Sequence, residues 1–366
     1  MIRGIELSDA ERQARDEAAL KAARERGAAA GLQDAANHPR PTGAPSVPGA
    51  AAAGSSGAAA EESKTQYGNL DPAVVKSIEE TILDSSPNVH WDDVKGLADV
   101  KTVLKETIIM PTMRPDIFRG LLAPSKGILL YGPPGNGKTM LAKAIATECQ
   151  STFFNCSAST LTSKWMGEGE KLMKALFAMA NAKAPAVIFI DEIDSIMGAR
   201  GGQEHEASRR LKTEFLVQFD GVNSAQEEKR ILVLAATNRP QDLDEAALRR
   251  MTRRIYMPLP DGEARRAFIE HKMKDANCGM SEDDYTQLVE MCQGYSCADL
   301  NQVVKEAAMI PLREIPPDQL MSMEGTSGLR PISLEDFRKS LQTNAPSVSQ
   351  ETINEFTEWR RSKGQV

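Results

Sequence analysis

The 366-residue sequence lacks the features that mark membrane-spanning, secreted and disulfide-rich proteins. It has no apolar run of about 18 residues, the length that a membrane-spanning helix needs. Its first ten residues contain no hydrophobic signal-peptide core. Its five cysteines form no CxxC pair and have no metal-ligand spacing. We therefore expect an intracellular protein with reduced thiols and no transmembrane segment.

The sequence also has no excess of positive charge. Its net charge of -7 argues against binding nucleic acid by charge alone. Residues 41–60 carry no charge and consist mainly of Ala, Gly, Pro and Ser, so they offer little apolar bulk and are expected to form a flexible linker. Residues 5–27 alternate charged residues with alanine. They favour either a solvated helix or one that folds on a partner.

Short apolar runs are abundant in the middle of the chain, where they alternate with amphipathic helical stretches. The runs are continuous, which is typical of parallel strands buried on both faces. The helices between them imply right-handed βαβ units. We predict the α/β class, with a parallel five-stranded sheet flanked by helices. The expected strands are residues 127–131, 152–156, 186–190, 231–237 and 254–259.

Helical patterns dominate outside this region. Asp71-Pro72 is a helix start signal, and a second helix is expected from Ala98 until Pro111 stops it. After Pro260 the strand signals end, which indicates a smaller helical domain. Its expected helices are residues 262–275, 281–293, 297–314 and 333–341, and a last helix is expected over 349–361.

A phosphate-binding motif follows the first buried strand. Residues 132–139 match G-x-x-x-x-G-K-[ST], with a strand before them and a helix after them. In such a loop, successive backbone N–H groups and the helix N-terminus surround the phosphates. Lys138 would reach the β- and γ-phosphates, and Thr139 would ligate Mg²⁺. The alternative is a chance glycine turn with a surface lysine. The predicted ligands are ATP and Mg²⁺, and the expected nucleotide-binding residues here are Gly132, Pro133, Pro134, Gly135, Asn136, Gly137, Lys138, Thr139 and Met140.

Polar residues end two later strands. Asp191 and Glu192 follow the apolar run 187–190, at the edge where open α/β sheets bind ligands. Asp191 could hold the Mg²⁺ shell, while Glu192 could polarise a water for attack on the γ-phosphate. Asn238 ends the next strand and could orient that water. The alternatives are two solvated acids and an ordinary turn residue.

Two adjacent arginines, Arg249 and Arg250, follow on a predicted helix. Paired arginines are usually a solvated face. An arginine supplied by a neighbouring subunit, however, can neutralise transition-state charge in phosphoryl transfer. Both interpretations stay open at this point.

Taken together, these motifs resemble the AAA ATPases of the so-called meiotic group, which includes spastin, fidgetin-like proteins, katanin and the vacuolar-sorting ATPase that disassembles ESCRT-III. The resemblance rests on GPPGNGKTMLAKAIA, AVIFIDEIDSI, AATNRPQDLDEAALRR and GYSCADL, and it covers about residues 70–366. Phrases similar to spastin and to fidgetin both occur, so the choice between them stays open. The resemblance implies a tail and linker over 1–66, a linker helix over 67–90, a large P-loop AAA domain over 91–259, a small helical lid domain over 260–345 and a C-terminal helix over 346–366.

The resemblance also implies roles for single residues. Asp93, in WDDVKGL, matches the segment that contacts adenine, and the C-terminal helix matches one that helps ring assembly. The other matches are to the Walker A, Walker B, sensor-1 and paired arginine-finger positions, at Lys138, Thr139, Asp191, Glu192, Asn238, Arg249 and Arg250.

Two substrate-gripping pore loops are implied in the same way. Trp165, preceded by Lys164, falls at the aromatic position of pore loop one, and Met166 stands where close relatives more often have Val. An aromatic residue in a ring's pore can intercalate between the side chains of an extended polypeptide. Pore loop two matches the segment that contains His205, Arg209 and Arg210. The basic residues of both loops suit an acidic substrate.

The function implied by the resemblance is a homo-hexamer, formed in the presence of ATP, that threads tubulin tails and severs microtubules. The expected location is the cytoplasm and cytoskeleton, with the nucleus as an alternative. Residues 1–66 hold eight Lys or Arg and nine Asp or Glu, a net charge of -1, which is too neutral to anchor on an acidic polymer. We therefore expect a targeting adaptor and no direct nucleic-acid binding.

Two rival functions stay open. The first is remodelling of ESCRT-III or of recombinase filaments by the same motor, although no Phe precedes Phe118 and an FxxA motif is therefore missing. The second is a non-catalytic ring member.

Overall fold

A computed structural model of the chain describes residues 70–84, 87–163, 169–198, 206–224, 230–274, 276–316 and 328–364. These residues belong to one compact unit, Ser55–Val366. The expected tail and linker over residues 1–66 lie outside the described residues.

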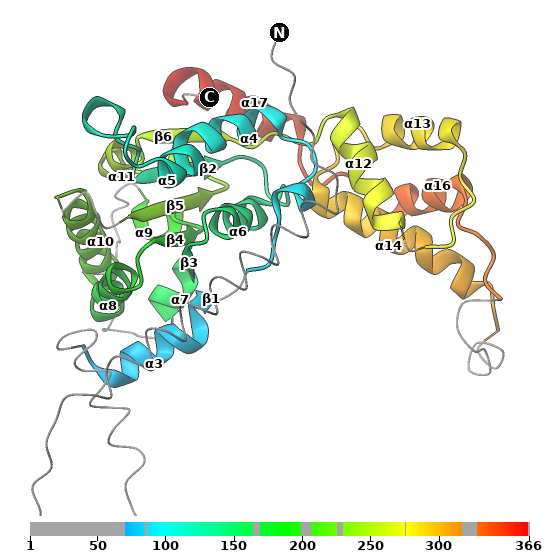
Figure 1. Ribbon diagram of the computed structural model, residues 1–366. Helices are drawn as coiled ribbons and strands as arrows, with labels where there is room; N and C mark the ends of the chain where they lie inside the picture. Colours follow the sequence, from blue (N-terminus) through cyan, green and yellow to red (C-terminus); the bar gives the residue numbers. More distant parts are fainter. Residues whose placement is uncertain are drawn as a thin grey trace, which may run out of the picture. The chain divides into compact units, whose positions relative to one another are not determined.

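A six-stranded sheet forms the centre of the large domain (Figure 1). Its strand order is β1-β3-β4-β5-β2-β6, and every neighbouring pair is parallel except β1 with β3. All five expected strands are present, but the strand count of five was wrong. The sixth strand, β1, is two residues long and follows a helix directly, so no periodicity in the sequence could reveal it. The strands are β1 (Leu83–Asp84), β2 (Gly127–Tyr131), β3 (Thr152–Ser157), β4 (Ala186–Asp191), β5 (Ile231–Thr237) and β6 (Arg253–Tyr256).

Both faces of the sheet are covered by helices. Leu129 and Ile188 point into a cluster with α3 (Pro72–Thr81), α8 (Gly169–Ala182) and α10 (Glu206–Ser224). The alternate residues Leu130 and Val187 pack with α4 (Ala98–Leu104) and α6 (Lys138–Glu148) on the other face. Because successive side chains of a strand point to opposite faces and both faces are buried, the strands read as continuous apolar runs.

The first predicted helix starts where its cap signal lies. The side chain of Asp71 accepts the N–H of Ala73 at 2.9 Å, and Pro72 occupies the first turn of α3. The second helix differs from the prediction, because it continues beyond Pro111. Helix α4 passes into a π-helical turn, Lys105–Ile109, and then into α5 (Met110–Met113), where proline is tolerated because it sits in the first turn.

The small helical domain has a core of its own, which includes Leu288, Leu300 and Phe337. Its helices are α12 (Gly262–Met273), α13 (Glu282–Met291), α14 (Cys297–Arg313) and α16 (Leu334–Thr343). The last helix, α17 (Gln350–Lys363), packs Phe356 and Trp359 into the core of the large domain. The remaining short helices are η1 (Trp91–Asp93), α7 (Ala158–Ser163), α9 (Asp194–Met197), η3 (Gly120–Leu122), η4 (Pro240–Asp242) and α11 (Glu245–Arg250).

Candidate active site

The loop from Gly132 to Gly137 joins the carboxyl end of β2 to the N-terminus of α6 (Figure 1). Two of its glycines have no room for a side chain. A Cβ at Gly132 would lie 2.2 Å from the carbonyl oxygen of Met257, and one at Gly135 would lie 2.7 Å from the Cβ of Ala298. Gly135 also has a φ of +77°, a conformation that other residues seldom adopt. The local structure therefore requires glycine at Gly132, which the motif prescribes, and also at Gly135, where the motif allows any residue.

Lys138 lies under this loop and is 7% exposed. Its Nζ donates to the carbonyl oxygens of Gly132, at 2.9 Å, and Pro133, at 2.8 Å. Burial lowers the pKa of Lys138 to about 8, although the charge of Asp191 acts in the opposite direction. A buried ammonium held by neutral carbonyls at a helix N-terminus suits the binding of a phosphate group.

Thr139 and Asp191 meet across the same edge of the sheet. The Thr139 Oγ1 donates to Asp191 Oδ2 at 2.9 Å, although the two residues are 52 positions apart. A hydroxyl and a carboxylate beside a phosphate loop are the hard oxygen ligands that Mg²⁺ prefers. Within the described residues no group of three or more His, Cys, Asp or Glu could hold a metal. The pair therefore fits Mg²⁺ as two of its ligands, and nucleotide oxygens and water would have to supply the others.

Glu192 and Asn238 are exposed at the ends of adjacent parallel strands, β4 and β5. Glu192 has a φ of +52°. For a residue with a side chain, this backbone conformation costs on the order of 1–3 kcal/mol of strain energy. The Glu192 N–H donates to Asp191 Oδ1 at 2.9 Å, which ties it to the Thr139–Asp191 pair. The structure thus brings the predicted metal ligands and the two predicted water-orienting residues to one edge of the sheet.

The other predicted nucleotide-binding residues differ in their contacts and in how far they are buried. Asp93 uses its Oδ2 to accept the His90 N–H at 2.8 Å, so it caps η1, which packs on α6. Asn136 is buried, while Pro134 is exposed, as is Met140 in the first turn of α6.

Sequence reasoning missed a contact between the phosphate loop and the small helical domain. The Ala298 N–H donates to the Gly135 carbonyl at 3.0 Å. Asn136 donates to the Pro258 carbonyl at 3.1 Å and accepts from the Cys297 N–H at 3.5 Å. The Ser296–Asp299 capping box that starts α14 is visible in the sequence. Its closeness to the phosphate loop is not, because Asn136 and Cys297 are 161 positions apart.

Arg249 and Arg250 end α11 at the opposite end of β2 from the phosphate loop. The carbonyl oxygen of Arg250 would lie 2.6 Å from a Cβ at Gly127, the first residue of β2. A five-residue strand separates that point from the loop by roughly 13 Å. Arg249 is exposed, whereas Arg250 makes two hydrogen bonds to the carboxylate of Asp220 on α10. The structure does not bring the arginines to the phosphate loop of their own chain.

Six residues were predicted to line the substrate pore. Lys164, Trp165, Met166 and His205 lie outside the described residues. Arg209 and Arg210 lie exposed in the first turns of α10, and Arg210 pairs with Glu206.

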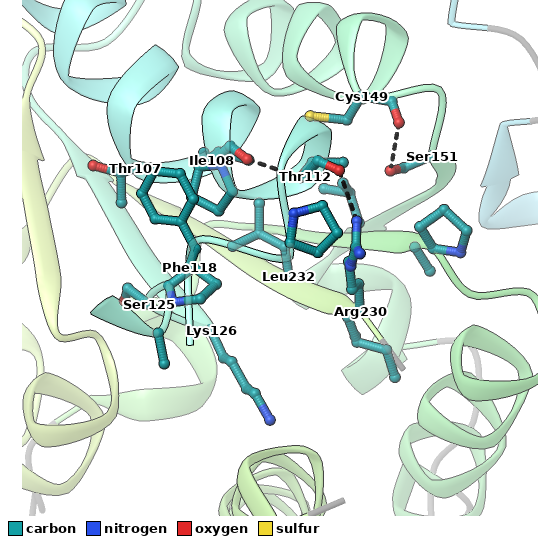
Figure 2. A pocket seen from close by; sticks show the side chains of 18 of the residues that line it. Thr107, Ile108, Thr112, Phe118, Ser125, Lys126, Cys149, Ser151, Arg230 and Leu232 are labelled. Carbon is teal, nitrogen blue, oxygen red and sulfur yellow. Dashed lines mark hydrogen bonds between the residues drawn. The ribbon is translucent and has the colours of Figure 1, made fainter. Parts of the chain in front are cut away.

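A separate cavity of about 690 Å³ lies near the N-terminal ends of β4 and β5 (Figure 2). Ile108, Phe118 and Leu232 line it, and Arg230 closes one side by donating to the Thr112 carbonyl at 2.7 Å. The phosphate loop follows the opposite, carboxyl end of the sheet. This cavity is therefore not part of the candidate active site.

Two family models and many known proteins match this chain. Residues 128–259 match the model of the ATPase family associated with various cellular activities (AAA), and residues 282–325 match the AAA+ lid domain. Spastin of Naegleria gruberi is 50% identical over 298 residues, which are 79% of this chain and 57% of that protein. The chain spans about half the length of the curated relatives that it matches first.

Two solved structures share the fold. The FIGL-1 AAA domain in complex with ADP has a TM-score of 0.75 and 43% identity, over 81% of this chain and 99% of that one. A katanin structure described as the structural basis for katanin self-assembly has a TM-score of 0.67 and 39% identity, over 80% of this chain and 98% of that one. In the part of the chain that the structure describes, no helix is both long and apolar enough to cross a membrane.

The predicted resemblance is thereby confirmed, together with the combination of an AAA domain and a lid domain. The chain belongs to the AAA family of ATPases, and it is similar to spastin and katanin.

Proposed function

We propose that the protein is a Mg²⁺-dependent ATP hydrolase that works as a hexameric ring. The observation that carries this proposal is the gathering of Lys138, the Thr139–Asp191 pair, Glu192 and Asn238 at one edge of the sheet. Lys138 and the loop N–H groups would hold the phosphates. Glu192 and Asn238 would orient one water toward the γ-phosphorus, with Glu192 accepting its proton. Mg²⁺, held by Thr139 and Asp191, would neutralise charge on the phosphate oxygens.

The position of the arginines supports a shared site. Arg249 lies exposed at the end of β2 that is far from its own phosphate loop, so in a ring it would act on the phosphates of another subunit. An arginine supplied in trans raises the rate of phosphoryl transfer by orders of magnitude. A closed ring lets every subunit both give and receive such an arginine. The self-assembly described for the similar katanin structure supports the same arrangement.

The proposed work of the ring is to pull polypeptide through its pore, with tubulin tails as substrate and microtubule severing as the result. The similarity to spastin and katanin supports this, as do the basic residues Arg209 and Arg210 at the start of α10. Association with the cytoskeleton, a targeting adaptor and a gripping role for Trp165 belong to the same proposal.

The test of the shared site is a mixing experiment with the full chain. The Lys138→Ala protein should bind no nucleotide, and the Arg249→Ala/Arg250→Ala protein should bind ATP without hydrolysing it. Mixed together, the two inactive proteins should regain phosphate release, because a double-arginine subunit can accept arginines from a Lys138→Ala neighbour. Arg338→Ala, which removes an exposed arginine of the lid domain, is the control and should keep wild-type activity. No recovery in the mixture would argue against a site shared between subunits.

Substrate and chemistry are tested separately. Wild-type protein with ATP should cut fluorescent microtubules, and intact filaments beside brisk ATP hydrolysis would favour another remodelled assembly. Trp165→Ala should hydrolyse ATP but not sever microtubules.

Glu192→Gln should bind ATP, and its rate of ATP hydrolysis should fall roughly 10²–10⁴-fold, because the group that accepts the proton of the attacking water is gone. Rapid hydrolysis by this variant would remove Glu192 from the proposed role.

A further inference from the structure

The two residues proposed to orient the attacking water, Glu192 and Asn238, lie on separate turns that are joined by a part-buried hydrogen bond between two side chains. The Thr237 Oγ1 donates to Asp194 Oδ1 at 2.6 Å. Thr237 is 1% exposed and ends β5, immediately before Asn238. Asp194 starts α9, two residues after Glu192. Thr237 and Asp194 are 43 residues apart in sequence, so this bond joins the two turns directly.

The Thr237 hydroxyl uses both of its hydrogen-bonding functions. While it donates to Asp194, it accepts the N–H of Arg239 at 2.9 Å. The backbone on both sides of Asn238 is therefore held by one hydroxyl. A valine would fill the same space with neither function, whereas a serine would keep both.

The turn that carries Glu192 is held from the same strand. The Ile193 N–H donates to the carbonyl of Ala236, the residue before Thr237, at 3.0 Å. The Ser195 N–H donates to the Glu192 carbonyl at 2.9 Å. Glu192 nevertheless has a φ of +52°, and such a conformation persists only where the surrounding contacts over-determine it.

We infer that Thr237 and Asp194 are positioning residues that fix the spacing between Glu192 and Asn238, so that both side chains address the same water. Neither residue needs to touch the nucleotide. The inference rests on the proposed function, because it concerns the geometry of ATP hydrolysis. A small displacement of an aligned water lowers the rate of reaction far more than it lowers the affinity for the phosphates, which are held by the loop on β2.

The experiment compares Thr237→Val with Thr237→Ser in the full chain. Thr237→Val should lower kcat for ATP at least about tenfold, while the Kd for a fluorescent ATP analogue and the oligomer size change less than about threefold. Thr237→Ser should stay within about threefold of wild type in kcat. A purely structural role would instead lower stability, nucleotide affinity and kcat together, and Thr237→Val with kcat within twofold of wild type would also overturn the inference.

Asp194→Ala removes the acceptor of the same hydrogen bond. It therefore provides a second test of the inference if Thr237→Val folds poorly. Asp194→Ala alone should reproduce the loss of kcat. The double variant should lose no more than either single variant, because both remove the same bond. Independent, multiplying losses would overturn the inference. Absence of hydrolysis by the wild-type protein would refute the proposed function itself, whereas active wild type with active Thr237→Val would refute only the positioning role.

Discussion

At the scale of single residues, the candidate site depends on positions where the backbone leaves no choice of side chain. Gly135 is the sharpest example. It has a φ of +77°, its carbonyl accepts the Ala298 N–H at 3.0 Å, and a Cβ there would lie 2.7 Å from the Cβ of Ala298. The same glycine thus shapes the phosphate loop and meets the first turn of α14.

Gly135→Ala should therefore weaken nucleotide binding at least about tenfold, since the loop must shift away from α14 to relieve the contact. Gly294→Ala is the matched control, because Gly294 also has a positive φ, +85°, but has nothing within 4 Å of the added Cβ. The control should lose roughly 1–2 kcal/mol of stability, because alanine seldom adopts a positive φ, without loss of nucleotide affinity. Titration of both variants with a fluorescent nucleotide checks this, and equal affinities would show that the contact with α14 is unimportant.

At the scale of elements, three helices of the lid domain, α13, α14 and α16, begin with reciprocal caps between Ser and Asp. In α16, Asp336 is 1% exposed and accepts hydrogen bonds from the Ser333 N–H and hydroxyl, each at 2.9 Å. Arg330 adds two hydrogen bonds to the same carboxylate, each at 2.7 Å. The Arg330 guanidinium is the main reason that the pKa of Asp336 is lowered to about 2.

A lowered pKa makes this cap pH-dependent. The folded state favours the ionised carboxylate, so its contribution is complete above the ordinary pKa of Asp and declines as pH falls toward 2. Asp336→Asn should therefore cost about 2 kcal/mol of unfolding free energy at pH 6, and the difference from wild type should shrink by about half at pH 3. Urea unfolding at both pH values measures it. Glu335→Gln, an exposed acid in the same turn, should change stability by less than about 0.5 kcal/mol; an equal cost of Asp336→Asn at both pH values would contradict the prediction.

The last helix, α17, is held to the sheet by aromatic contacts. The ring of Trp359 lies 4.5 Å from that of Tyr131 in an edge-on arrangement, and Phe356 lies 6.1 Å from Tyr256. Tyr131 ends β2, so this helix packs directly behind the residue that precedes the phosphate loop.

Trp359→Ala should destabilise the protein by about 3 kcal/mol through the cavity it leaves, and it should also weaken nucleotide binding because Tyr131 loses its support. The exposed neighbour Glu358→Ala should change stability by less than about 0.5 kcal/mol. Thermal unfolding with and without nucleotide compares the two. Unchanged nucleotide affinity in a destabilised Trp359→Ala protein would limit α17 to a stabilising role.

At the scale of the whole molecule, the proposed phosphate site and the proposed arginines occupy opposite ends of one strand. Gly127 touches the end of α11, and Tyr131 leads into the phosphate loop. In the proposed ring, each subunit would therefore contribute to two sites, with its phosphate loop in one and its arginines in the next.

ATP hydrolysis per subunit should therefore rise steeply with protein concentration and then reach a plateau when the rings are complete. Phosphate release measured over a hundredfold range of concentration, beside the oligomer size at each point, checks this. A constant rate per subunit from dilute to concentrated protein, combined with full activity of Arg249→Ala/Arg250→Ala, would exclude the shared site.

Much of this organisation could be predicted from the sequence, because it depends on short-range patterns. Strands buried on both faces must be continuous apolar runs, which located β2 to β6. A phosphate loop needs its glycines and lysine in a fixed order, so residues 132–139 were identifiable from spacing alone. The ends of β4 and β5 were visible as polar residues after apolar runs, and this predicted Asp191, Glu192 and Asn238.

The pairings between distant residues were decided only by the tertiary structure. The Arg250–Asp220 pair joins positions 30 apart, the Asn136–Cys297 contact joins positions 161 apart, and the Thr237–Asp194 bond joins positions 43 apart. Apolar periodicity specifies which face of an element is buried, but a polar pair depends on how two elements meet. The sequence by itself therefore determined which elements form and which chemistry they carry. Packing alone decided that Arg250 is held by its own chain while Arg249 is exposed, and that one hydroxyl links the turns of Glu192 and Asn238.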